Sequence, residues 1–351
     1  MKQKINEYIN KIEMVSGRTK LFSLPRWVQV EPTNLCNQSC EMCPRNTQLD
    51  SPLGKMSLEN FKKVYEEIPT IKDLQLNGLG EPLINDDIFE MVKFAKSKGS
   101  NVTLTSNCEL ATKDKAEKLV QSGLDVLKIS MDSADPAVYS SIRHGHLDRA
   151  LEGVKNIVSS RKNNRSRLPR IWFNSILMES NYEAMLEIIK LGSELEIDYV
   201  RFKPINVFDV YQDKDLKVPV EKLFSKIEEV ITQSKNFPVE HNLELLLHNK
   251  DIHYKPKETI CPCFSPWLEV YIQWYGGVRL CCEFYSSKYD LGNLFEKPFR
   301  EIWNGQSMRL IRELFKKCQM NFPVCTNCNR FQRNIALNNK INNFKKRIFL
   351  K

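Results

Sequence analysis

The chain of 351 residues has no long apolar run at its N-terminus and only five histidines. Residues 1–17 mix charged and apolar side chains at helical spacing, which is not the pattern of a signal peptide or a membrane anchor. The histidines show no spacing typical of zinc ligands. Because eleven cysteines accompany no export signal, we expect metal binding or redox chemistry in the cytoplasm and not a disulfide framework.

Composition allows a large folded core but does not name a function. With 42% hydrophobic residues, the chain has enough apolar material for two domains, or for one large domain with an appendage. The net charge of +9 is moderate for this length. Because no strand-and-aromatic pattern of an RNA-binding module accompanies it, a solvated basic surface is favoured over a nucleic-acid site.

Strand-like and helical segments alternate up to about residue 205, which is a βαβ rhythm. The expected strands cover residues 27–30, 73–77, 101–105, 126–130, 170–176 and 199–203. Between them lie apolar stripes at helical spacing, such as Phe61, Val64 and Ile68. These units predict a parallel α/β barrel or an open doubly wound sheet, and in both the ligand sites gather at the carboxyl ends of the strands.

Three cysteines follow the first strand in the segment EPTNLCNQSCEMCPRN. Cys36, Cys40 and Cys43 are spaced as C-x3-C-x2-C, and no fourth cysteine or histidine lies nearby in the sequence. A structural zinc site normally closes with four ligands, so three thiolates favour a cubic iron–sulfur cluster with one iron left open. This spacing and the residues around it resemble the radical S-adenosylmethionine (SAM) family, over residues 27 to about 205.

The resemblance implies an α/β fold, a partial (β/α)6 barrel, that holds a 4Fe-4S cluster with SAM at the open iron. In that family the reduced cluster cleaves SAM to a 5′-deoxyadenosyl radical. The protein positions the sulfonium of SAM, excludes water and directs the radical to one substrate hydrogen.

A glycine-containing segment after the second strand, NGLGEP, resembles the family motif that binds the SAM amino group. Gly80 allows close backbone approach, and Glu81 is implied to accept hydrogen bonds from the SAM ammonium. Leu79 splits the two glycines of this chain, unlike the usual pattern. A plain strand-to-helix turn is the alternative interpretation.

The segment SMDS, at the end of the fourth strand, resembles the family's ribose motif. It implies Ser130 and Asp132 as partners of the sugar hydroxyls, with an Asp helix cap before Pro136 as the alternative. The other implied contacts are Met42 with adenine, Asn107 near SAM, Arg143 with the SAM carboxylate and Asn181 in a strand-five motif. For Met42, core packing is the alternative.

A second group of cysteines lies in residues 261–331, which hold seven of the eleven. The elements CPCFSPW, GGVRLCC, LGNLFEKPFREIW and VCTNCNRF occur in the order of the SPASM or twitch extension of radical SAM enzymes. The resemblance implies a hairpin over residues 268–281, turning at Gly276 and Gly277, and an auxiliary 4Fe-4S cluster. Its implied ligands are Cys263, Cys281, Cys325 and Cys328. A four-cysteine zinc site satisfies the same spacing.

The remaining cysteines have no clear ligand role. Cys108 is expected to be a buried small hydrophobe. Cys261 and Cys282 could each replace a neighbouring ligand, and Cys318 matches no family position, so we expect all three to be free thiols. Full SPASM domains bind two clusters, but no cysteine follows Cys328, so one auxiliary cluster is expected.

We expect four parts along the chain. Residues 1–25 are predicted to form an N-terminal helical extension and residues 26–240 the barrel. Residues 241–331 are predicted to form a small α+β iron–sulfur domain that includes a strand at 243–247, and residues 332–351 a basic helix. The apolar stripe of that helix could lie on an anionic membrane surface, but packing on the barrel or docking to a partner is favoured.

The leading functional hypothesis is a two-electron oxidation of a small alcohol or sugar-like molecule, with flavodoxin or ferredoxin as the electron donor. A maturase of ribosomally made peptides is the alternative. It is disfavoured because residues 1–26 are too few for a fused peptide-recognition domain. A noncatalytic iron–sulfur or zinc-binding protein is a further alternative, against which Glu81 and the SMDS segment argue. No catalytic base is indicated.

Overall fold

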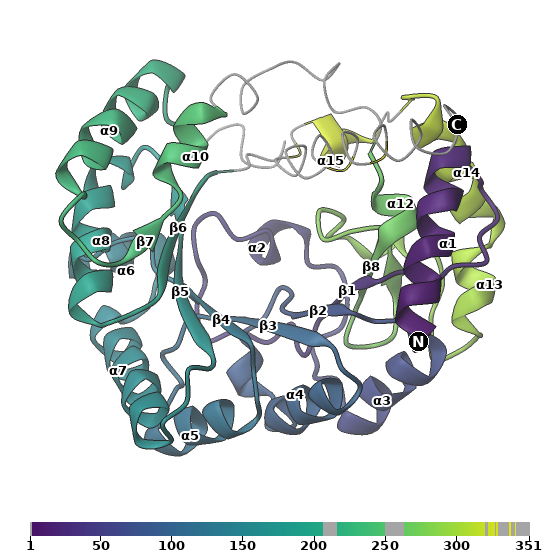
Figure 1. The fold of residues 1–351 in the computed structure, drawn as a ribbon, viewed down its shortest axis with the longest axis horizontal. Helices are drawn as coiled ribbons and strands as arrows, with labels where there is room; N and C mark the ends of the chain where they lie inside the picture. Colours follow the sequence, from purple (N-terminus) through teal and green to yellow (C-terminus); the bar gives the residue numbers. More distant parts are fainter. Residues whose placement is uncertain are drawn as a thin grey trace.

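A single curved sheet organises the chain (Figure 1). The computed structural model describes residues 2–205, 216–249, 263–319, 322–326, 328, 337 and 341. The strand order is β7-β6-β5-β4-β3-β2-β1-β8-β9, and each neighbouring pair is parallel except β8 with β9. The strands are β1 Trp27–Val30, β2 Asp73–Leu76, β3 Asn101–Ser106, β4 Val126–Ser130, β5 Arg170–Leu177, β6 Tyr199–Pro204, β7 Glu240–His241, β8 Glu269–Ile272 and β9 Val278–Arg279.

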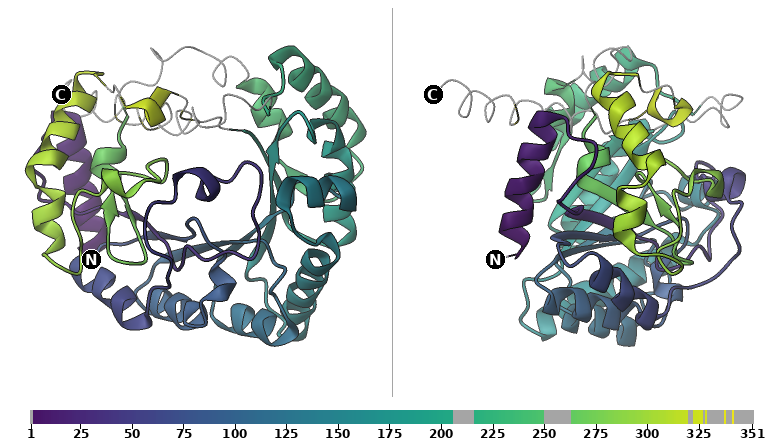
Figure 2. Two further views of the ribbon diagram at one scale, coloured as in Figure 1. Left: turned by 180° about the vertical axis from the view of Figure 1, so that it is seen from behind. Right: turned by 90° about the vertical axis from the view of Figure 1, so that its right-hand side faces the viewer.

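Most helices cover the convex face of the sheet, while the short α2 and the loop that carries it lie on the concave side (Figures 1 and 2). The helices are α1 Lys2–Ser16, α2 Arg45–Gln48, α3 Leu58–Glu67, α4 Ile88–Ser97, α5 Lys113–Gln121, α6 Pro136–Arg143, α7 Leu147–Asn163, α8 Met185–Glu194, α9 Val220–Gln233, α10 Leu243–His248, α12 Ser265–Leu268, α13 Phe299–Trp303, α14 Gln306–Lys316 and α15 Pro323–Thr326. Side-chain caps fix several starts: Ser57 caps α3, Thr112 caps α5 and Asp135 caps α6.

The predicted partial barrel is confirmed. All six expected strands are present within one or two residues of the predicted ends. Their residues alternate between a fully buried face, for example Leu127, Ile129 and Phe173, and a face that remains partly accessible. The buried face packs under the helices, since these residues belong to one continuous hydrophobic core with helix residues such as Ile157 and Ile188.

The predicted hairpin is also confirmed, and it extends the barrel sheet itself. β8 and β9 pair in antiparallel fashion around a turn in which Gly276 has φ +93, a conformation that favours glycine. β8 in turn pairs in parallel with β1, in the register Trp27↔Glu269 to Val30↔Ile272. The iron–sulfur segment is therefore joined edge to edge with the first barrel strand, and the division into domains stays a prediction.

The strand predicted at residues 243–247 is wrong, because this stretch forms helix α10. Leu243 and Leu246 are buried, three residues apart, which is a helical and not a strand period. Asn242, just before the helix, bonds both backbone groups of Phe202, through its Oδ1 at 2.7 Å and its Nδ2 at 2.9 Å. These bonds occupy the backbone groups of Phe202 just beyond the last β6–β7 pair, and the helix begins at the next residue, Leu243.

The N-terminal extension is helical, as predicted, and docks on the iron–sulfur segment. In α1, the Asn10 side chain donates to the carbonyl of Trp267 in α12 at 2.7 Å. The predicted tail helix at 332–351 lies outside the described residues except for Leu337 and Ile341, and Ile341 is buried in the main core. Among the described residues, no helix has both the length and the apolar character needed to cross a membrane.

Candidate active site

The three cysteines of the first group lie in one loop that begins directly after β1. Cys40 is buried, while Cys36 and Cys43 are half-buried. Burial raises the pKa of the Cys36 thiol to about 11, and the Cys40 and Cys43 thiols contribute to the rise. Burial likewise raises the pKa of Cys43, with Cys40 again contributing. The three sulfurs are therefore electrostatic neighbours within one pocket of low polarity.

The donor set of this loop fits a cluster held by three thiolates. The next cysteine along the chain, Cys108, is fully buried in the main hydrophobic core, as predicted, and is not a fourth ligand. Cys36, Cys40 and Cys43 would hold the cluster, which would supply the electron that SAM cleavage requires.

Glu81 lies directly beside the cysteine loop, as the family resemblance implied. Its carboxylate is 3% exposed and accepts hydrogen bonds from Ser106 Oγ at 2.7 Å and from the backbone N–H of Asn107 at 2.7 Å. Its own backbone N–H donates to the carbonyl of Leu35 at 2.8 Å. Burial raises the pKa of Glu81, and its hydrogen bonds oppose that rise. The turn after β2 is thus fixed to both the β1 loop and the end of β3.

Gly80 is required by the same close approach. A Cβ atom at this position would collide with the backbone carbonyls of Thr33 and Leu35. We therefore expect Gly80→Ala to push the cysteine loop away and to destabilise the fold by about 1–3 kcal/mol. Thermal unfolding and iron content after anaerobic reconstitution would measure both effects.

Gly99→Asn is the matched control for Gly80→Ala. Nothing lies within 4 Å of a Cβ atom there, and Asn tolerates the positive φ of +79. Equal unfolding temperatures and equal iron content for the two variants would contradict a packing requirement at Gly80.

Asn107 and Glu109 connect the end of β3 to the cysteine loop. Asn107 Nδ2 donates to Asn37 Oδ1 at 2.8 Å. Glu109 accepts from Asn37 Nδ2 at 2.9 Å and from Gln38 Nε2 at 2.7 Å, and also from the backbone N–H of His146 at 2.6 Å. Asn107 was predicted, whereas Glu109 was missed, because nothing in its sequence neighbourhood marks a residue whose partners in the cysteine loop are 71 and 72 positions away.

Asp132 and Arg143 form a buried ion pair that reaches the cysteine loop. Arg143 Nε and Nη2 lie 2.6 and 2.5 Å from Asp132 Oδ2, and Arg143 Nη1 lies 3.9 Å from the sulfur of Cys40. Burial alone would lower the pKa of the Arg143 guanidinium, but Asp132 and Cys40 raise it above its ordinary value. The arginine therefore stays charged and offers a fixed positive group beside the sulfur.

The other oxygen of Asp132 holds strand β5. Asp132 Oδ1 accepts from the backbone N–H of Ile176 at 2.7 Å, so both carboxylate oxygens are engaged within the protein. The helix-cap alternative is wrong, since Asp135 caps α6 by accepting from Ala137 and Val138. Ser130 lies half-buried at the end of β4, and the ribose contacts of Ser130 and Asp132 stay predictions.

Asn181 is a buried connector in the loop after β5. Its Nδ2 donates to the carbonyls of Asp132 and Ile176, both at 2.9 Å, and its Oδ1 accepts from the N–H of Met178 at 2.8 Å. Met42 packs against a small apolar cluster formed by Ile142, Met178 and Leu216. The structure therefore brings the predicted SAM residues together at one end of the barrel, while their contacts with SAM stay predictions.

The auxiliary cysteines lie on the hairpin and on the segments around it. Cys263, Cys281 and Cys325 are half-buried and pack against the main core. Burial raises the pKa of Cys325 to about 12, and the nearby Cys263 thiol adds to that rise. Cys328 is half-buried. Their role as cluster ligands stays a prediction.

Two of the expected free thiols can be checked among the described residues. Cys282 forms no disulfide, as predicted, and its thiol donates to Glu283 Oε1 at 3.7 Å. The prediction for Cys318 is wrong, because this residue is disulfide-bonded. Cys318 follows the end of α14 at φ +62, and the sequence has no local pattern to indicate which thiol approaches it after folding. Cys261 lies outside the described residues.

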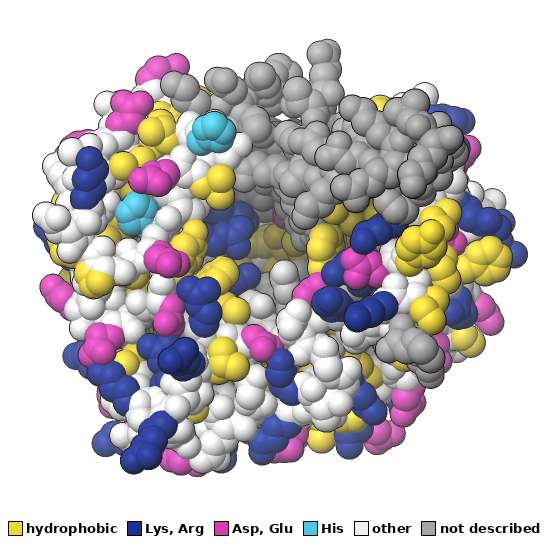
Figure 3. Space-filling model, in the orientation of Figure 1, with side chains coloured by type: hydrophobic (Ala, Val, Ile, Leu, Met, Phe, Trp, Pro, Cys, Tyr) yellow, Lys and Arg dark blue, Asp and Glu magenta, His cyan; other side chains and the backbone are white. Residues whose placement is uncertain are grey.

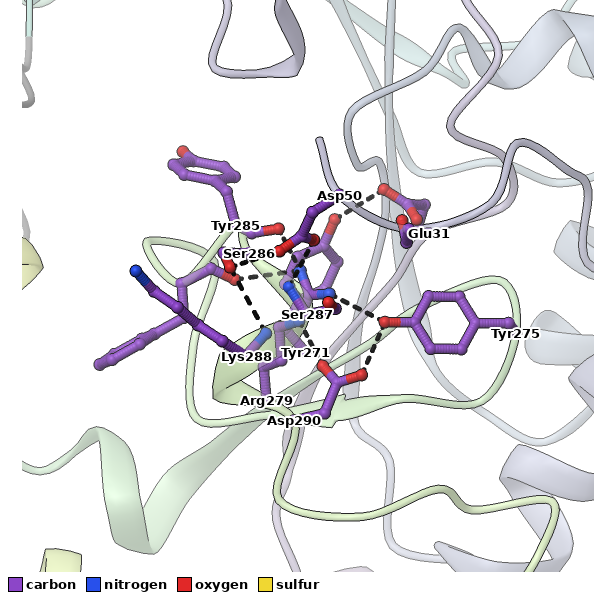
Figure 4. Close-up of polar contacts among 12 residues, drawn as sticks. Glu31, Asp50, Tyr271, Tyr275, Arg279, Tyr285, Ser286, Ser287, Lys288 and Asp290 are labelled. Carbon is purple, nitrogen blue, oxygen red and sulfur yellow. Dashed lines mark hydrogen bonds and ion pairs between the residues drawn. The ribbon is translucent and has the colours of Figure 1, made fainter. Parts of the chain in front are cut away.

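The iron–sulfur segment forms hydrogen bonds and close contacts with the chain just beyond the first cysteine group (Figure 4). Asp50 accepts from Ser286 Oγ and from the backbone N–H of Ser287, both at 2.6 Å. Trp274, in the hairpin turn, lies so close to Gly54 that any side chain there would collide with its ring. The segment that follows the cysteine loop is therefore held at Asp50 and at Gly54 by residues that lie more than 200 positions later in the sequence.

Arg279 in β9 holds the loop that carries Ser286 and Ser287 (Figure 4). It is 0% exposed, and its Nε donates to Asp290 at 2.6 Å. Its other nitrogens donate to the Tyr275 hydroxyl at 2.9 Å and to the carbonyls of Phe284 and Tyr285. One guanidinium thus fixes both ends of the loop that carries Ser286 and Ser287.

We expect Arg279→Leu to lower the free energy of unfolding by about 2–3 kcal/mol, because two buried carbonyls and a hydroxyl lose their donor. It should also loosen the Asp50 contact and increase proteolysis in residues 282–290. Denaturant unfolding and limited proteolysis would measure these changes. Arg309→Leu, at an exposed position in α14, is the control, and an equal effect of both variants would show that the network has no special role.

The fold and the site define a class of protein: an open parallel α/β barrel with a three-cysteine cluster loop at the carboxyl ends of its strands. The model of the radical SAM superfamily matches residues 30–192, and that of the SPASM iron–sulfur cluster-binding domain matches residues 261–329. The chain belongs to the radical SAM superfamily and carries a C-terminal SPASM domain, and the cofactors of such enzymes are 4Fe-4S clusters and SAM.

Several known proteins are similar over most of the chain. The tungsten-containing aldehyde ferredoxin oxidoreductase cofactor-modifying protein of Pyrococcus furiosus is 24% identical, covering 86% of this chain and 87% of that protein. The AdoMet-dependent heme synthase of Methanosarcina barkeri is 25% identical, covering 87% and 91%. The crystal structure of Streptococcus suis SuiB bound to its precursor peptide SuiA superposes with a TM-score of 0.67 at 17% identity, covering 86% and 70%.

Proposed function

We propose that the protein is a radical SAM oxidoreductase that removes a hydrogen atom and then an electron from a small alcohol or sugar-like molecule. The observation that carries the proposal is the convergence of the cysteine loop, Glu81, Asn107 and the Asp132–Arg143 pair at one end of the barrel. When bound, the cluster and SAM supply the 5′-deoxyadenosyl radical. We place this activity in the cytoplasm, with flavodoxin or ferredoxin as the donor.

The residues of the chain have separate roles in this proposal. Glu81 fixes the β2 turn through hydrogen bonds to both carboxylate oxygens, and its negative charge would attract the positive ammonium of SAM. Arg143 holds a positive charge beside Cys40, which stabilises the negative charge of a thiolate-bound cluster. The half-buried Ser130 and the cluster around Met42 provide a polar and an apolar contact for the nucleoside. Cys263, Cys281, Cys325 and Cys328 would hold the auxiliary cluster that accepts the second electron.

The test is anaerobic reconstitution with iron and sulfide, followed by reduction with dithionite in the presence of SAM. We expect 5′-deoxyadenosine and methionine to form in equal amounts, measured by liquid chromatography and mass spectrometry. A fully iron-loaded protein that leaves SAM intact would overturn the proposal and support a noncatalytic iron–sulfur protein.

Peptide modification is the second candidate. SuiB shares the fold, and its crystal structure contains a precursor peptide. A peptide substrate would accelerate 5′-deoxyadenosine formation and lose mass by a whole number of hydrogens. An alcohol substrate would instead give an aldehyde or ketone that a carbonyl reagent traps.

A further inference from the structure

The buried face of helix α1 carries polar side chains. Asn6 and Asn10 are 8% and 2% exposed. The Asn6 side chain donates to the carbonyl of Leu24 at 2.9 Å and accepts from the N–H of the same residue at 2.8 Å. Asn10 donates to the carbonyl of Trp267 in α12 at 2.7 Å. Hydrogen bonds of these two asparagines therefore fix the orientation of the helix on the body of the protein.

The outer face of the same helix carries large apolar side chains. Ile5, Tyr8 and Ile12 are 52%, 59% and 41% exposed, and their spacing of three and four residues places them on one stripe. Phe22, 65% exposed, is tied to the helix because its N–H donates to Glu13 at 2.6 Å. Hydrophobic side chains gather over α1 in Figure 3, with Lys and Arg side chains around them. A surface helix ordinarily turns its apolar stripe toward the core, so this arrangement favours a face that a partner covers.

Three cations near the apolar stripe have no carboxylate partner among the described residues. Lys4, Arg18 and Lys20 are all exposed. The Arg18 guanidinium lies 4.7 Å from the centre of the Phe22 ring, and its Nε donates to the backbone carbonyl of Lys20 at 2.9 Å. The charges of these three residues are therefore not neutralised within this part of the protein.

The two acids of α1 are already engaged within the protein. Glu7 is half-buried and pairs with both Lys11 and Arg26 at 3.0 Å, so that Lys11 adds no free charge to the surface. Glu13 is 3% exposed and accepts hydrogen bonds from the backbone N–H groups of residues 22 and 23. In residues 3–22, all of them described, no carboxylate is exposed. The outer face of α1 is therefore apolar with a positive surround.

The inner side of α1 contacts the auxiliary cysteine segment. Besides the Asn10 bond, the Trp267 indole N–H donates to the carbonyl of Arg18, just beyond the helix, at 2.8 Å. Trp267 follows Cys263 by four residues, and four residues span at most about 14 Å. A protein bound to the outer face of α1 would therefore lie one helix diameter, about 10 Å, from the segment that carries this predicted cluster ligand.

Like charge disfavours two other occupants of this face. In a symmetric contact, a second copy of the chain would bring the same unpaired cations against one another. Residues 332–351 contain six Lys or Arg and no Asp or Glu, so they too are positively charged. Leu337 and Ile341 of that segment pack against the main core. A separate partner with a negative surface is therefore favoured.

We propose that the outer face of α1 docks a small electron-transfer protein with an acidic surface, of the flavodoxin or ferredoxin class. The inference rests on the proposed function, in which the substrate radical gives one electron to the auxiliary cluster at each turnover. The oxidised carrier takes that electron, dissociates in its one-electron-reduced form and so restores the oxidised state of the cluster. Ile5, Tyr8 and Ile12 supply the apolar contact, while Lys4 and Lys20 attract the acidic surface.

Binding of oxidised flavodoxin to the full-length protein tests the apolar contact without turnover. We expect the double variant Ile5→Ser with Ile12→Ser to raise the dissociation constant, measured by calorimetry, about tenfold. Its unfolding temperature should stay unchanged, since both side chains are exposed. Leu245→Ser in α10, at a position that is 58% exposed, is the matched control and should bind as the wild type does. Equal weakening by Leu245→Ser, or no binding by the wild type, would overturn the proposal.

Charge variants and salt test the acidic character of the partner. Lys4→Glu with Lys20→Glu should weaken binding about tenfold, and raising the salt concentration from about 50 to about 300 mM should weaken binding by the wild type. Lys113→Glu with Lys190→Glu, at exposed positions in α5 and α8, is the control and should have a smaller effect. Binding that responds to neither salt nor Lys4 and Lys20 would overturn the proposal. Binding of phosphatidylserine vesicles in place of flavodoxin would overturn it in favour of a membrane contact.

Hydrogen–deuterium exchange of the wild-type protein locates the contact without any variant. Oxidised flavodoxin should slow exchange in residues 3–16 but not in α8. Cleavage of SAM with dithionite needs no protein carrier, and the Ile5→Ser, Ile12→Ser variant should keep it. Loss of that cleavage in the wild type would overturn the proposed function alone, because binding and exchange are measured without turnover. Normal cleavage without protection of α1 would overturn the docking site alone.

Discussion

Replacing Cys36, Cys40 and Cys43 together by alanine should abolish 5′-deoxyadenosine formation and remove about four irons per chain. The expected loss is complete, because no other cysteine lies close enough in the sequence to replace a ligand of this loop. Iron and sulfide analysis, electron paramagnetic resonance of the reduced protein and product assays would measure it. With an auxiliary cluster present, iron should fall from about eight to about four per chain.

Cys108→Ala is the matched control for the triple variant. Cys108 is fully buried near the same end of the barrel, and its backbone N–H donates to Ser106, which in turn bonds Glu81. The variant should keep both its iron and its SAM cleavage. Residual cleavage in the triple variant, or equal iron loss from Cys108→Ala, would show that the first cysteine group is not the site of the cluster. If the wild-type protein contained only about four irons per chain, the prediction of an auxiliary cluster would be wrong.

Much of the barrel could be predicted from sequence because its signals are local. Each predicted strand combines an apolar run with a flanking turn, and the cysteine spacing marks one short loop. The family resemblance implied the hairpin with its turn at Gly276 and Gly277, and the observed turn at Gly276 confirms it. By contrast, the LELLL stretch at 243–247 fits a strand or a helix equally well in length and apolarity. Its conformation depends on Asn242 bonding Phe202, 40 residues earlier.

The contacts within the site were less predictable, since they depend on side chains from distant strands. The sequence suggests Asp132 and Arg143 as separate SAM contacts, but the fold pairs them with each other. Glu109 and Asp50 hold the cysteine loop and the segment after it, yet neither belongs to a motif. The attachment of β8 to β1 was also not predicted, because strand order between distant segments has no local signature.

These contacts explain how the cysteine loop is held rigid at one end of the barrel. The cysteine loop has hydrogen bonds from the β2 turn, the β3 end and the segment after α6, while the SPASM hairpin holds the residues that follow it. A cluster ligand that shifts by 1 Å would misplace the sulfonium, and such misplacement slows a positioned reaction strongly. The iron–sulfur segment therefore holds in place the chain that follows the first cysteine loop. This support does not depend on the function of the auxiliary cluster.

Arg143→Met should have the largest effect on stability of any single substitution discussed. It leaves the Asp132 carboxylate, which is 0% exposed, without its cation, and breaking a buried pair in this way costs about 3–5 kcal/mol. It also removes the positive group 3.9 Å from Cys40. We therefore expect a lower denaturation midpoint, a more negative cluster reduction potential and slower SAM cleavage, measured by denaturant unfolding, redox titration and product assays.

The double variant Asp132→Asn with Arg143→Met separates the two effects. Removing the orphaned carboxylate should recover part of the lost stability, because Asn can still accept the hydrogen bond from Ile176. The reduction potential should not recover, since the charge beside Cys40 is still absent. Lys190→Met in the outer helix layer controls for the loss of a surface cation and should change neither quantity. If the single and double variants were equally destabilised, the buried Asp132 charge would not be the cause of the loss.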